Sequence, residues 1–451
     1  FSYRKVEAYR LSTSYEKEVG NSLISITPYY RDNSMKIIPS WSVSYDATQY
    51  DSKSQSIGFL SKYRHDFEPL RARLIVGLDF DLSPGSRDED SLRLTRTTNA
   101  LGGKTYAYDT ASAPIKIYQY DVTYRSISPY VHGEISPTEN LRLIGGLRYD
   151  DMQFDYKNTL NGGSVSAVQG YANFVGPVWF GRVADTKIGY SHWGPKLGAT
   201  YALSKETSVF ANYANSFRTP SESQLFRPSS GANANLAQQN ALSLLNLKPV
   251  IVDNYEVGVR GKAGEANYEV SVYRMEKSDD IVSYKDPVTN ARTTVNAGQS
   301  LHRGIEIGAG APLAKEWRID ASVSYQKQIY AKWVLPGTAD YSGKEMESAP
   351  RVLANTRLTY APGYMNGGRV QLEWVKVGPY WLDPTNTLKY AGHDLFNLRA
   401  NLPLDKQLEV WASVTNLLDK RYAETASTDS GAAAYTVGLP RAAIVGLQAK
   451  W

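Results

Sequence analysis

The chain ends in the stretch Ala442-Ala443-Ile444-Val445-Gly446-Leu447-Gln448-Ala449-Lys450-Trp451. Counted back from Trp451, every second residue is apolar, and Lys450 and Gln448 lie at the positions between. Successive side chains of a β-strand point to opposite faces, so this alternation predicts a strand with one apolar and one polar face.

The same alternation recurs along the whole chain. In 73–82 and 317–326 one face is apolar and the other polar; the apolar sets are Leu74, Val76, Leu78, Phe80 and Leu82, and Trp317, Ile319, Ala321, Val323 and Tyr325. We count about 18 such segments in hairpin order, long enough to cross a bilayer when tilted. A soluble sandwich would not keep this pattern over so many hairpins with Tyr or Trp near the strand ends. We therefore expect an all-β fold, a transmembrane antiparallel β-barrel formed by residues 1–451, with lipid outside and a polar lumen.

The composition supports this fold class. The 33 Tyr and 9 Trp against 11 Phe suit a barrel, whose two aromatic girdles lie at the membrane interfaces. No run of about 18 apolar residues is present, which excludes a helical membrane protein. The absence of Cys removes disulfides and thiolate metal sites. The net charge is only +5, and Lys and Arg are interleaved with Asp and Glu instead of forming a basic block, so no nucleic-acid partner is expected.

Connections between the segments come in two sizes. Short turns at 261–264 and 405–406 are typical of the periplasmic side of such a barrel. Long irregular segments, expected outside the cell, run over 84–114, 156–187, 217–249, 330–349 and 423–437. Long loops are usually functional, so we expect ligand binding there.

A series of short motifs resembles the TonB-dependent outer-membrane receptors over nearly the whole chain. In order these are SPYV at 128–131, GLRYD at 146–150, WGPKLG at 193–198, YANSFRTP at 213–220, NYEVG at 254–258, NAG at 296–298 with HRGIE at 302–306, and VTNLLDKRY at 414–422. The aromatic end at Trp451 resembles the signal that the barrel-assembly machinery reads in this family.

The resemblance implies a 22-stranded barrel with a plug domain in its lumen and an energy-coupling motif before the plug. The opening segment, with Tyr9, Leu11 and Tyr15 in alternation, already predicts a barrel strand. We therefore expect a truncated chain that lacks the plug and roughly the first four strands. A complete 18-stranded barrel is the alternative.

The resemblance also implies a function in the outer membrane of a Gram-negative bacterium: energy-coupled import of a scarce ligand, with a ferric siderophore favoured. Its implied partners are that ligand, the lipid bilayer with its lipopolysaccharide, and an inner-membrane energy-coupling protein that pulls on the plug. Haem receptors of this family typically carry a His between the FRxP element and a downstream NxxLKP-like element. Haem is disfavoured because that interval, 221–246, contains no His. Haem, cobalamin, an oligosaccharide and a passive substrate-specific porin remain alternatives.

Two long loops combine aromatic and basic residues, a mixture that suits an anionic ferric chelate. The predicted ligand-binding residues are Phe174, Trp179, Phe180 and Arg182 in one loop, and Arg218, Phe226 and Arg227 in the other. As an alternative, Trp179 and Phe180 anchor their loop at the outer girdle.

No catalytic, cofactor or metal site is expected. The five His residues lie far apart, without the spacing of a metal pair; they are His65, His132, His192, His302 and His393. We interpret Glu256 and Glu306, with Arg260 and Arg303, as a self-neutralising ladder of lumen charges rather than as acid-base catalysts. Calcium binding at the acidic runs 88–90 and 279–280 is left open.

Overall fold

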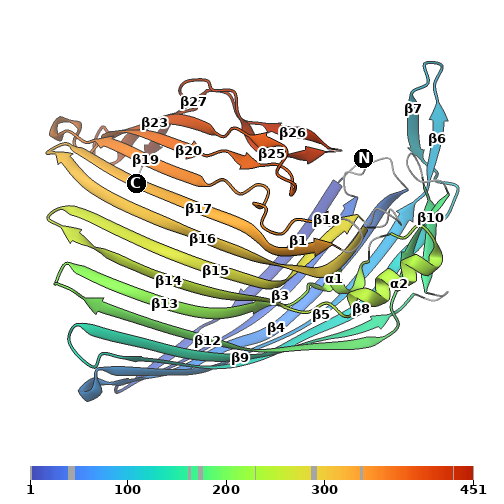
Figure 1. Cartoon of the computed structure of the whole chain (residues 1–451), viewed down its shortest axis with the longest axis horizontal. Helices are drawn as coiled ribbons and strands as arrows, with labels where there is room; N and C mark the ends of the chain where they lie inside the picture. The colour runs from blue at the N-terminus through green and yellow to red at the C-terminus, as the bar shows by residue number, and fades with distance from the viewer. Residues whose placement is uncertain are drawn as a thin grey trace.

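Among the residues that the structure describes, one antiparallel sheet of 19 strands curves around a hollow; 18 of these strands form the wall, and the two-residue strand at 339–340 lies in a connection (Figure 1). The computed structural model describes residues 3–38, 46–160, 164–170, 176–228, 230–285, 292–335, 339–429 and 431–449. Figure 1 shows β13 to β17 in front and β1 and β3 to β5 behind them. The sheet confirms the all-β transmembrane fold that the alternation predicted.

Wall strands follow one another as hairpins. In chain order they are β1 (Tyr3–Ser12), β2 (Tyr15–Val19), β3 (Ser22–Ile38), β4 (Ala47–Phe67), β5 (Ala72–Leu92), β8 (Ile115–Ile135), β9 (Leu141–Asn158), β12 (Thr186–Ala202), β13 (Thr207–Arg218), β14 (Val250–Ala263), β15 (Ala266–Lys285), β16 (Arg292–Ala314), β17 (Trp317–Leu335), β19 (Val352–Tyr360), β20 (Arg369–Val377), β23 (His393–Pro403), β24 (Leu408–Thr415) and β27 (Ala442–Ala449). Both β1 and β2 pair with β3, so they form one line along it.

Shorter elements occupy the connections. They are the strands β6 (Leu94–Thr98), β7 (Lys104–Tyr108), β10 (Val165–Gln169), β11 (Pro177–Gly181), β18 (Ala339–Asp340), β21 (Tyr380–Trp381), β22 (Lys389–Tyr390), β25 (Ala423–Asp429) and β26 (Ala432–Val437), the helices α1 (Glu222–Phe226) and α2 (Ala234–Leu244), and the 3₁₀ turns η1 (Glu68–Leu70) and η2 (Gly363–Met365). Within the described ranges, no helix is long and apolar enough to cross a membrane.

The two kinds of connection lie at opposite ends of the wall. Register partners Ala263 and Ala266 flank a tight turn in which Gly264 has a φ of +62°, a conformation that favours glycine. The helices and the β6–β7 hairpin lie at the other end, where the hairpin projects beyond the rest (Figure 1). This separation orients the barrel with its short turns toward the periplasm.

Two of the predicted loop boundaries are wrong. Loop 84–114 was expected to begin at Pro84, but β5 continues to Leu92, and Pro84 pairs in register with Thr123. Similarly, β17 continues past Tyr330 to Leu335. The wall strands keep their ladder hydrogen bonds beyond the apolar band, where their outward side chains become polar. The change from apolar to polar side chains therefore marks the border of the membrane and not the end of the strand.

The terminal strands each have one paired edge among the residues described. There β1 and β2 pair only with β3, and β27 pairs only with β24. In β27 the alternation of the quoted stretch is kept, with Val445 opposite Ala412 and Leu447 opposite Val410. Trp451, the expected assembly signal, lies outside the described residues.

A loop module and cavity at the mouth of the barrel

The loop after β13 folds into two capped helices. Ser221 and Gln224 form a reciprocal capping box at the start of α1: Gln224 N donates to Ser221 Oγ (3.3 Å) and Ser221 N donates to Gln224 Oε1 (2.9 Å). At the start of α2, Leu236 N donates to Asn233 Oδ1 over 2.8 Å. Each helix of this segment therefore has its own N-terminal cap, which marks where it starts.

An aromatic core joins these helices to the wall and to the β10–β11 hairpin. The ring of Phe226 stacks on Tyr156 of β9 with 4.4 Å between centroids, and Tyr118 of β8 meets Phe180 edge-on at 6.3 Å. We call this assembly the loop module. Its buried members are Ile117, Tyr118, Tyr120, Phe154, Tyr156, Val168, Val178, Phe180, Val183, Leu225, Phe226, Ala241, Leu244 and Leu247.

Helix α2 lies directly on the β10–β11 hairpin. A Cβ added at Gly181 would lie 2.2 Å from the backbone oxygen of Ala237, so only glycine permits this approach. Trp179 and Gly231 exchange two backbone hydrogen bonds, of 3.2 and 2.7 Å, which fix the segment before α2 against β11. The hairpin and helix therefore form one packed unit.

Arg182 lies inside this unit with 2% of its surface exposed. Its guanidinium donates to Ile117 O (3.1 Å), Ser166 Oγ (2.5 Å) and Val165 O (3.3 Å). Burial lowers the pKa of this guanidinium. The hydrogen bonds tie the loop to β8 and β10, which is a structural role.

Arg227, just after α1, forms a bridge to β5. Its Nε and Nη2 donate to the two carboxylate oxygens of Glu89, at 3.0 and 3.2 Å, and Arg87 donates to the same buried carboxylate. Burial alone would lower the Arg227 pKa, but the Glu89 carboxylate raises it above its usual value. Tyr120 of the wall also hydrogen-bonds Glu222 of α1. These polar contacts hold α1 on the wall.

The structure thus divides the predicted ligand-binding residues into two groups. Phe180, Arg182 and Phe226 are buried in the loop module, because the aromatic and basic mixture serves the folding of the loop itself. Trp179, Arg218 and Arg227 keep exposed surface, and their role in ligand binding stays a prediction. Phe174 lies outside the described residues.

A cavity of about 300 Å³ lies between the inner face of the wall and α1. Among its lining residues are Met35, Arg87, Tyr124, Phe154 and Glu222, which come from β3, β5, β8, β9 and α1. Tyr124 and Phe154 are direct register partners, with ring centroids 5.2 Å apart. The sequence analysis missed this site because its residues are far apart in the chain. Tyr118, Tyr120 and Tyr124, all at even positions of β8, were the available signal of an inward aromatic face.

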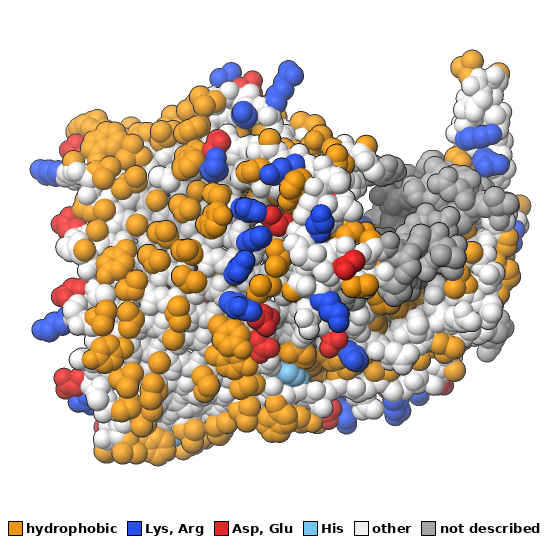
Figure 2. Space-filling view, viewed as in Figure 1, with side chains coloured by type: hydrophobic (Ala, Val, Ile, Leu, Met, Phe, Trp, Pro, Cys, Tyr) orange, Lys and Arg blue, Asp and Glu red, His pale blue; other side chains and the backbone are white. Residues whose placement is uncertain are grey.

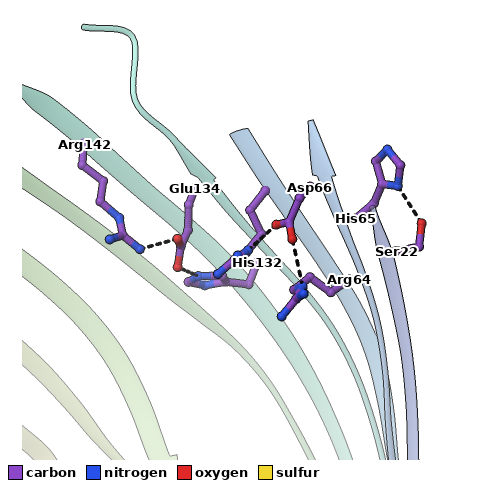
Figure 3. A network of polar contacts seen from close by, with 8 residues as sticks. Ser22, Arg64, His65, Asp66, His132, Glu134 and Arg142 are labelled. Atoms are coloured by element: carbon purple, nitrogen blue, oxygen red, sulfur yellow. Dashed lines mark hydrogen bonds and ion pairs between the residues drawn. The ribbon is translucent and has the colours of Figure 1, made fainter. Parts of the chain in front are cut away.

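Deeper in the lumen the walls carry self-neutralising polar networks near the short turns (Figure 3). Glu134 accepts from Arg142 and contacts His132 Nε2 at 3.1 Å. Asp66 pairs with Arg73 (2.5 Å) and with Arg64 (3.2 Å). A larger cavity of about 620 Å³ lies along this part of the wall, with Lys62, Lys196 and His132 in its lining.

The predicted lumen ladder needs one correction. Glu256 and Glu306 line a lumen cavity, and Arg260 lines another, but Arg303 lies on the outer face. Glu306 and Arg303 are an odd number of residues apart in β16, so their side chains must point to opposite faces. Arg303 therefore cannot neutralise lumen carboxylates.

Acidic runs considered for calcium are paired with lysine in the structure. Lys116 bonds Asp88 and lies 3.1 Å from Asp90, and Lys277 lies 2.7 Å from Asp280. Across the described ranges, no group of three or more His, Asp or Glu side chains is arranged to hold a metal ion.

A sheet with an apolar outer band, a polar lumen and a folded extracellular module defines a receptor-type outer-membrane β-barrel. Residues 1–417 match the family described as TonB dependent receptor-like, beta-barrel. The chain belongs to this family of outer-membrane transport receptors, as its motif series predicted.

Individual relatives are distant. The ferric-pyoverdine 358 receptor of Pseudomonas putida is 22% identical over 324 residues, and the probable TonB-dependent siderophore receptor PiuA of Acinetobacter baumannii is 23% identical over 318. Each match covers 67% of this chain but only 33% and 38% of those relatives. The crystal structure of PiuA superimposes with a TM-score of 0.71 at 17% identity, over 100% of this chain and 65% of that chain. The copper transporter OprC gives the same TM-score at 18% identity, over 98% and 64%.

Proposed function

We propose that the protein containing this chain is an outer-membrane receptor that binds a ferric siderophore at its extracellular mouth and imports it by an energy-coupled step. The observation that carries the ligand class is the cavity between α1 and the inner wall. Tyr124 keeps a partly exposed aromatic face there beside the largely buried Phe154, and the lining also includes Glu222 and Arg87, whose guanidinium donates to Glu89. Stacking on Tyr124 suits an aromatic arm of an iron chelate, and the exposed Arg218 at the end of β13 offers positive charge to an anionic one.

The size of the cavity indicates that it encloses only part of the ligand. An apolar cavity of about 150 Å³ holds a benzene ring. The cavity of about 300 Å³ therefore suits one substituted ring of a chelate, with the iron centre left in the open lumen. Trp179, Arg218 and Arg227 would then contact the rest of the ligand.

The remaining parts of the proposal come from the family. The protein acts as a transporter and not as an enzyme, because import needs no covalent change in the ligand. An inner-membrane energy-coupling protein acts through a plug domain, and the barrel-assembly machinery reads the aromatic end at Trp451. Both partners are proposed on the resemblance alone.

Binding to purified receptor tests the ligand class. The probes are a ferric catecholate, a ferric hydroxamate, haem and cobalamin. Each is titrated into the receptor, and quenching of the receptor's intrinsic fluorescence reports binding. Tyr124→Ala should weaken binding of the cognate ferric chelate roughly 5-fold, because an aromatic contact contributes about 1 kcal/mol beyond its buried area. Tyr364→Ala is the matched control, since Tyr364 lies exposed in η2 at a short turn.

Two outcomes would contradict the proposal. Tight binding of haem or cobalamin, with no binding of either ferric chelate, would replace the ligand class. Uptake that persists in cells whose inner-membrane proton gradient has been collapsed would indicate a passive porin instead.

A further inference from the structure

The neighbouring wall strands β12 and β13 pair over only part of their length. Their register ends at Lys196 opposite Ala214. Beyond that pair, toward the loops, β12 continues over 186–195 and β13 over 215–218, yet no register pair joins them in the described range 176–228. Each strand stays paired on its other side, β12 with β9 and β13 with β14. We call the unpaired interval between 186–195 and 215–218 the seam.

Side-chain positions show that the two strands have lost their register in the seam. If the register continued, Trp193 would lie opposite Phe217. Instead the ring of His192 stacks on Phe217 with centroids 4.5 Å apart, and Trp193 stacks on Tyr149 of β9 at 4.7 Å. The seam begins on β12 at Pro195, a residue type that has no backbone N–H to offer to a ladder.

Side chains close the seam where the ladder is absent. The His192 Nε2 atom lies 2.6 Å from Asn215 Oδ1, and Asn215 Nδ2 donates to Asp253 Oδ1 of β14 over 2.8 Å. Because the amide nitrogen of Asn215 faces a carboxylate, its Oδ1 is the acceptor and His192 Nε2 is the donor. Further along the seam, Tyr190 OH donates to Leu247 O over 2.9 Å.

The seam lies on the water side of the membrane border. Figure 2 shows hydrophobic side chains spread over the near face of the wall, with Lys, Arg, Asp and Glu gathered on the side of it toward the loops. Tyr and Trp lie at headgroup level, so the stacked pair Trp193 and Tyr149 marks the end of the seam nearest the membrane. Backbone groups without a ladder partner cannot face lipid, but above the border water can solvate them.

The two sides of the seam carry different parts of the mouth. On one side β12 continues through β9 to β8, where Phe226 of the loop module stacks on Tyr156 and Tyr124 lines the mouth cavity. On the other side β13 ends at Arg218, which pairs in register with Val250 of β14. Tyr124 and Arg218, both proposed above to contact the ligand, therefore lie on opposite sides of the seam.

We propose that the seam is a hinge of the mouth, at which the end of β13 moves away from and back toward the loop module in the folded protein. Opening it breaks side-chain contacts but no ladder hydrogen bonds, whereas the same separation of two paired strands would break several. An element with two arrangements close in free energy is the usual basis of such a motion. The motion itself does not depend on the imported ligand; only its use to clamp a ligand between Tyr124 and Arg218 rests on the proposed function.

Distances between paired spin labels test the hinge, because the chain contains no Cys and each introduced pair of thiols is unique. The test pair is Ser191→Cys/Ser216→Cys, with one exposed position on each side of the seam. The control pairs keep one of these positions and add its register partner across an intact ladder; they are Ser191→Cys/Asp151→Cys and Ser216→Cys/Val252→Cys. In frozen solution the test pair should give two distances that differ by about 5 Å, one strand spacing, and each control pair should give one.

Removal of the ring stack provides a second readout. In the test pair, Phe217→Ala should raise the ratio of long to short distances roughly 5-fold, the effect expected for the loss of one aromatic pair. Trp193→Ala is the matched control, since it removes the neighbouring stack on the paired side of β12 and should leave the ratio unchanged.

Heat-modifiable mobility first establishes that all labelled proteins are folded. A single distance in the test pair, unchanged by Phe217→Ala, would overturn the proposal. An equal change of the ratio in Trp193→Ala would also overturn it, because it would indicate a general loosening of the wall. The measurement needs no ligand, so a failure to bind any ferric chelate would contradict the proposed function without affecting this result.

Discussion

The barrel wall and the loop module place their apolar side chains in opposite ways. In the wall, residues such as Ile307 and Leu447 point outward and remain exposed until lipid covers them. In the loop module, Phe180 and Phe226 point inward and are covered by other parts of the same chain. The wall therefore depends on the membrane for the burial of its apolar face, whereas the module has a core of its own.

Aromatic residues of a membrane barrel therefore have two structural roles. An aromatic ring at the end of a wall strand, such as Trp317, marks the interface with lipid. An aromatic ring in a long loop can instead be core, as the stack of Phe226 on Tyr156 shows. Loop composition alone does not identify a ligand site.

The largest effect is expected in the core of the loop module. Phe226→Ala should destabilise the module by about 3 to 5 kcal/mol, since the ring is 1% exposed and its removal leaves a cavity. Hydrogen exchange over 219–249 should accelerate while the wall keeps its heat-modifiable mobility. The control is Leu242→Ala, an exposed position of α2. Loss of the whole barrel in Phe226→Ala would contradict the separation of the two regions.

A second prediction concerns the two faces of the wall. Ile307→Lys places a charge against lipid near the middle of the band and should cost about 2 to 4 kcal/mol in unfolding from lipid vesicles. Ser322→Lys lies at nearly the same height but faces the lumen, where water solvates the added charge, so its effect should be small. Equal destabilisation of both variants would mean that the faces have been assigned wrongly.

The smallest structural effect is expected at Arg218. Its side chain is exposed at the end of β13, so Arg218→Gln should change the free energy of unfolding by less than about 0.5 kcal/mol. Any loss of ferric chelate binding in this variant would then report a direct contact. Unchanged affinity would remove Arg218 from the proposed site and leave the inner wall as the main contact surface.

Sequence alone predicted the wall well and the loops poorly, for a physical reason. The faces of a strand follow from parity, so Leu74 to Leu82 or Trp317 to Tyr325 could be assigned without knowing any neighbour. Parity also shows that Arg303 and Glu306 cannot share a face. The burial of Arg182 depends on Ile117 and Ser166, whose proximity only the folded chain reveals.

The mouth cavity illustrates the same limit. Tyr124 and Phe154 are about 30 residues apart and meet through the register of β8 and β9, while Glu222 arrives from a different loop. The parity of β8 places Tyr124 on the inward face once the strand is known, although the sequence analysis did not single it out. It could not predict that α1 would close over that position.

The central claim is that ligand binds on the inner wall at the mouth, beside Tyr124, and not on the buried loop residues Phe180, Arg182 and Phe226. The chain contains no Cys, so Tyr124→Cys introduces a single thiol into it. Its rate of labelling by a membrane-impermeant maleimide should fall at least roughly 10-fold when a ferric siderophore occupies about nine-tenths of the receptor or more, because only the unoccupied fraction is labelled. An unchanged labelling rate, with siderophore binding verified on the same sample, would contradict the account.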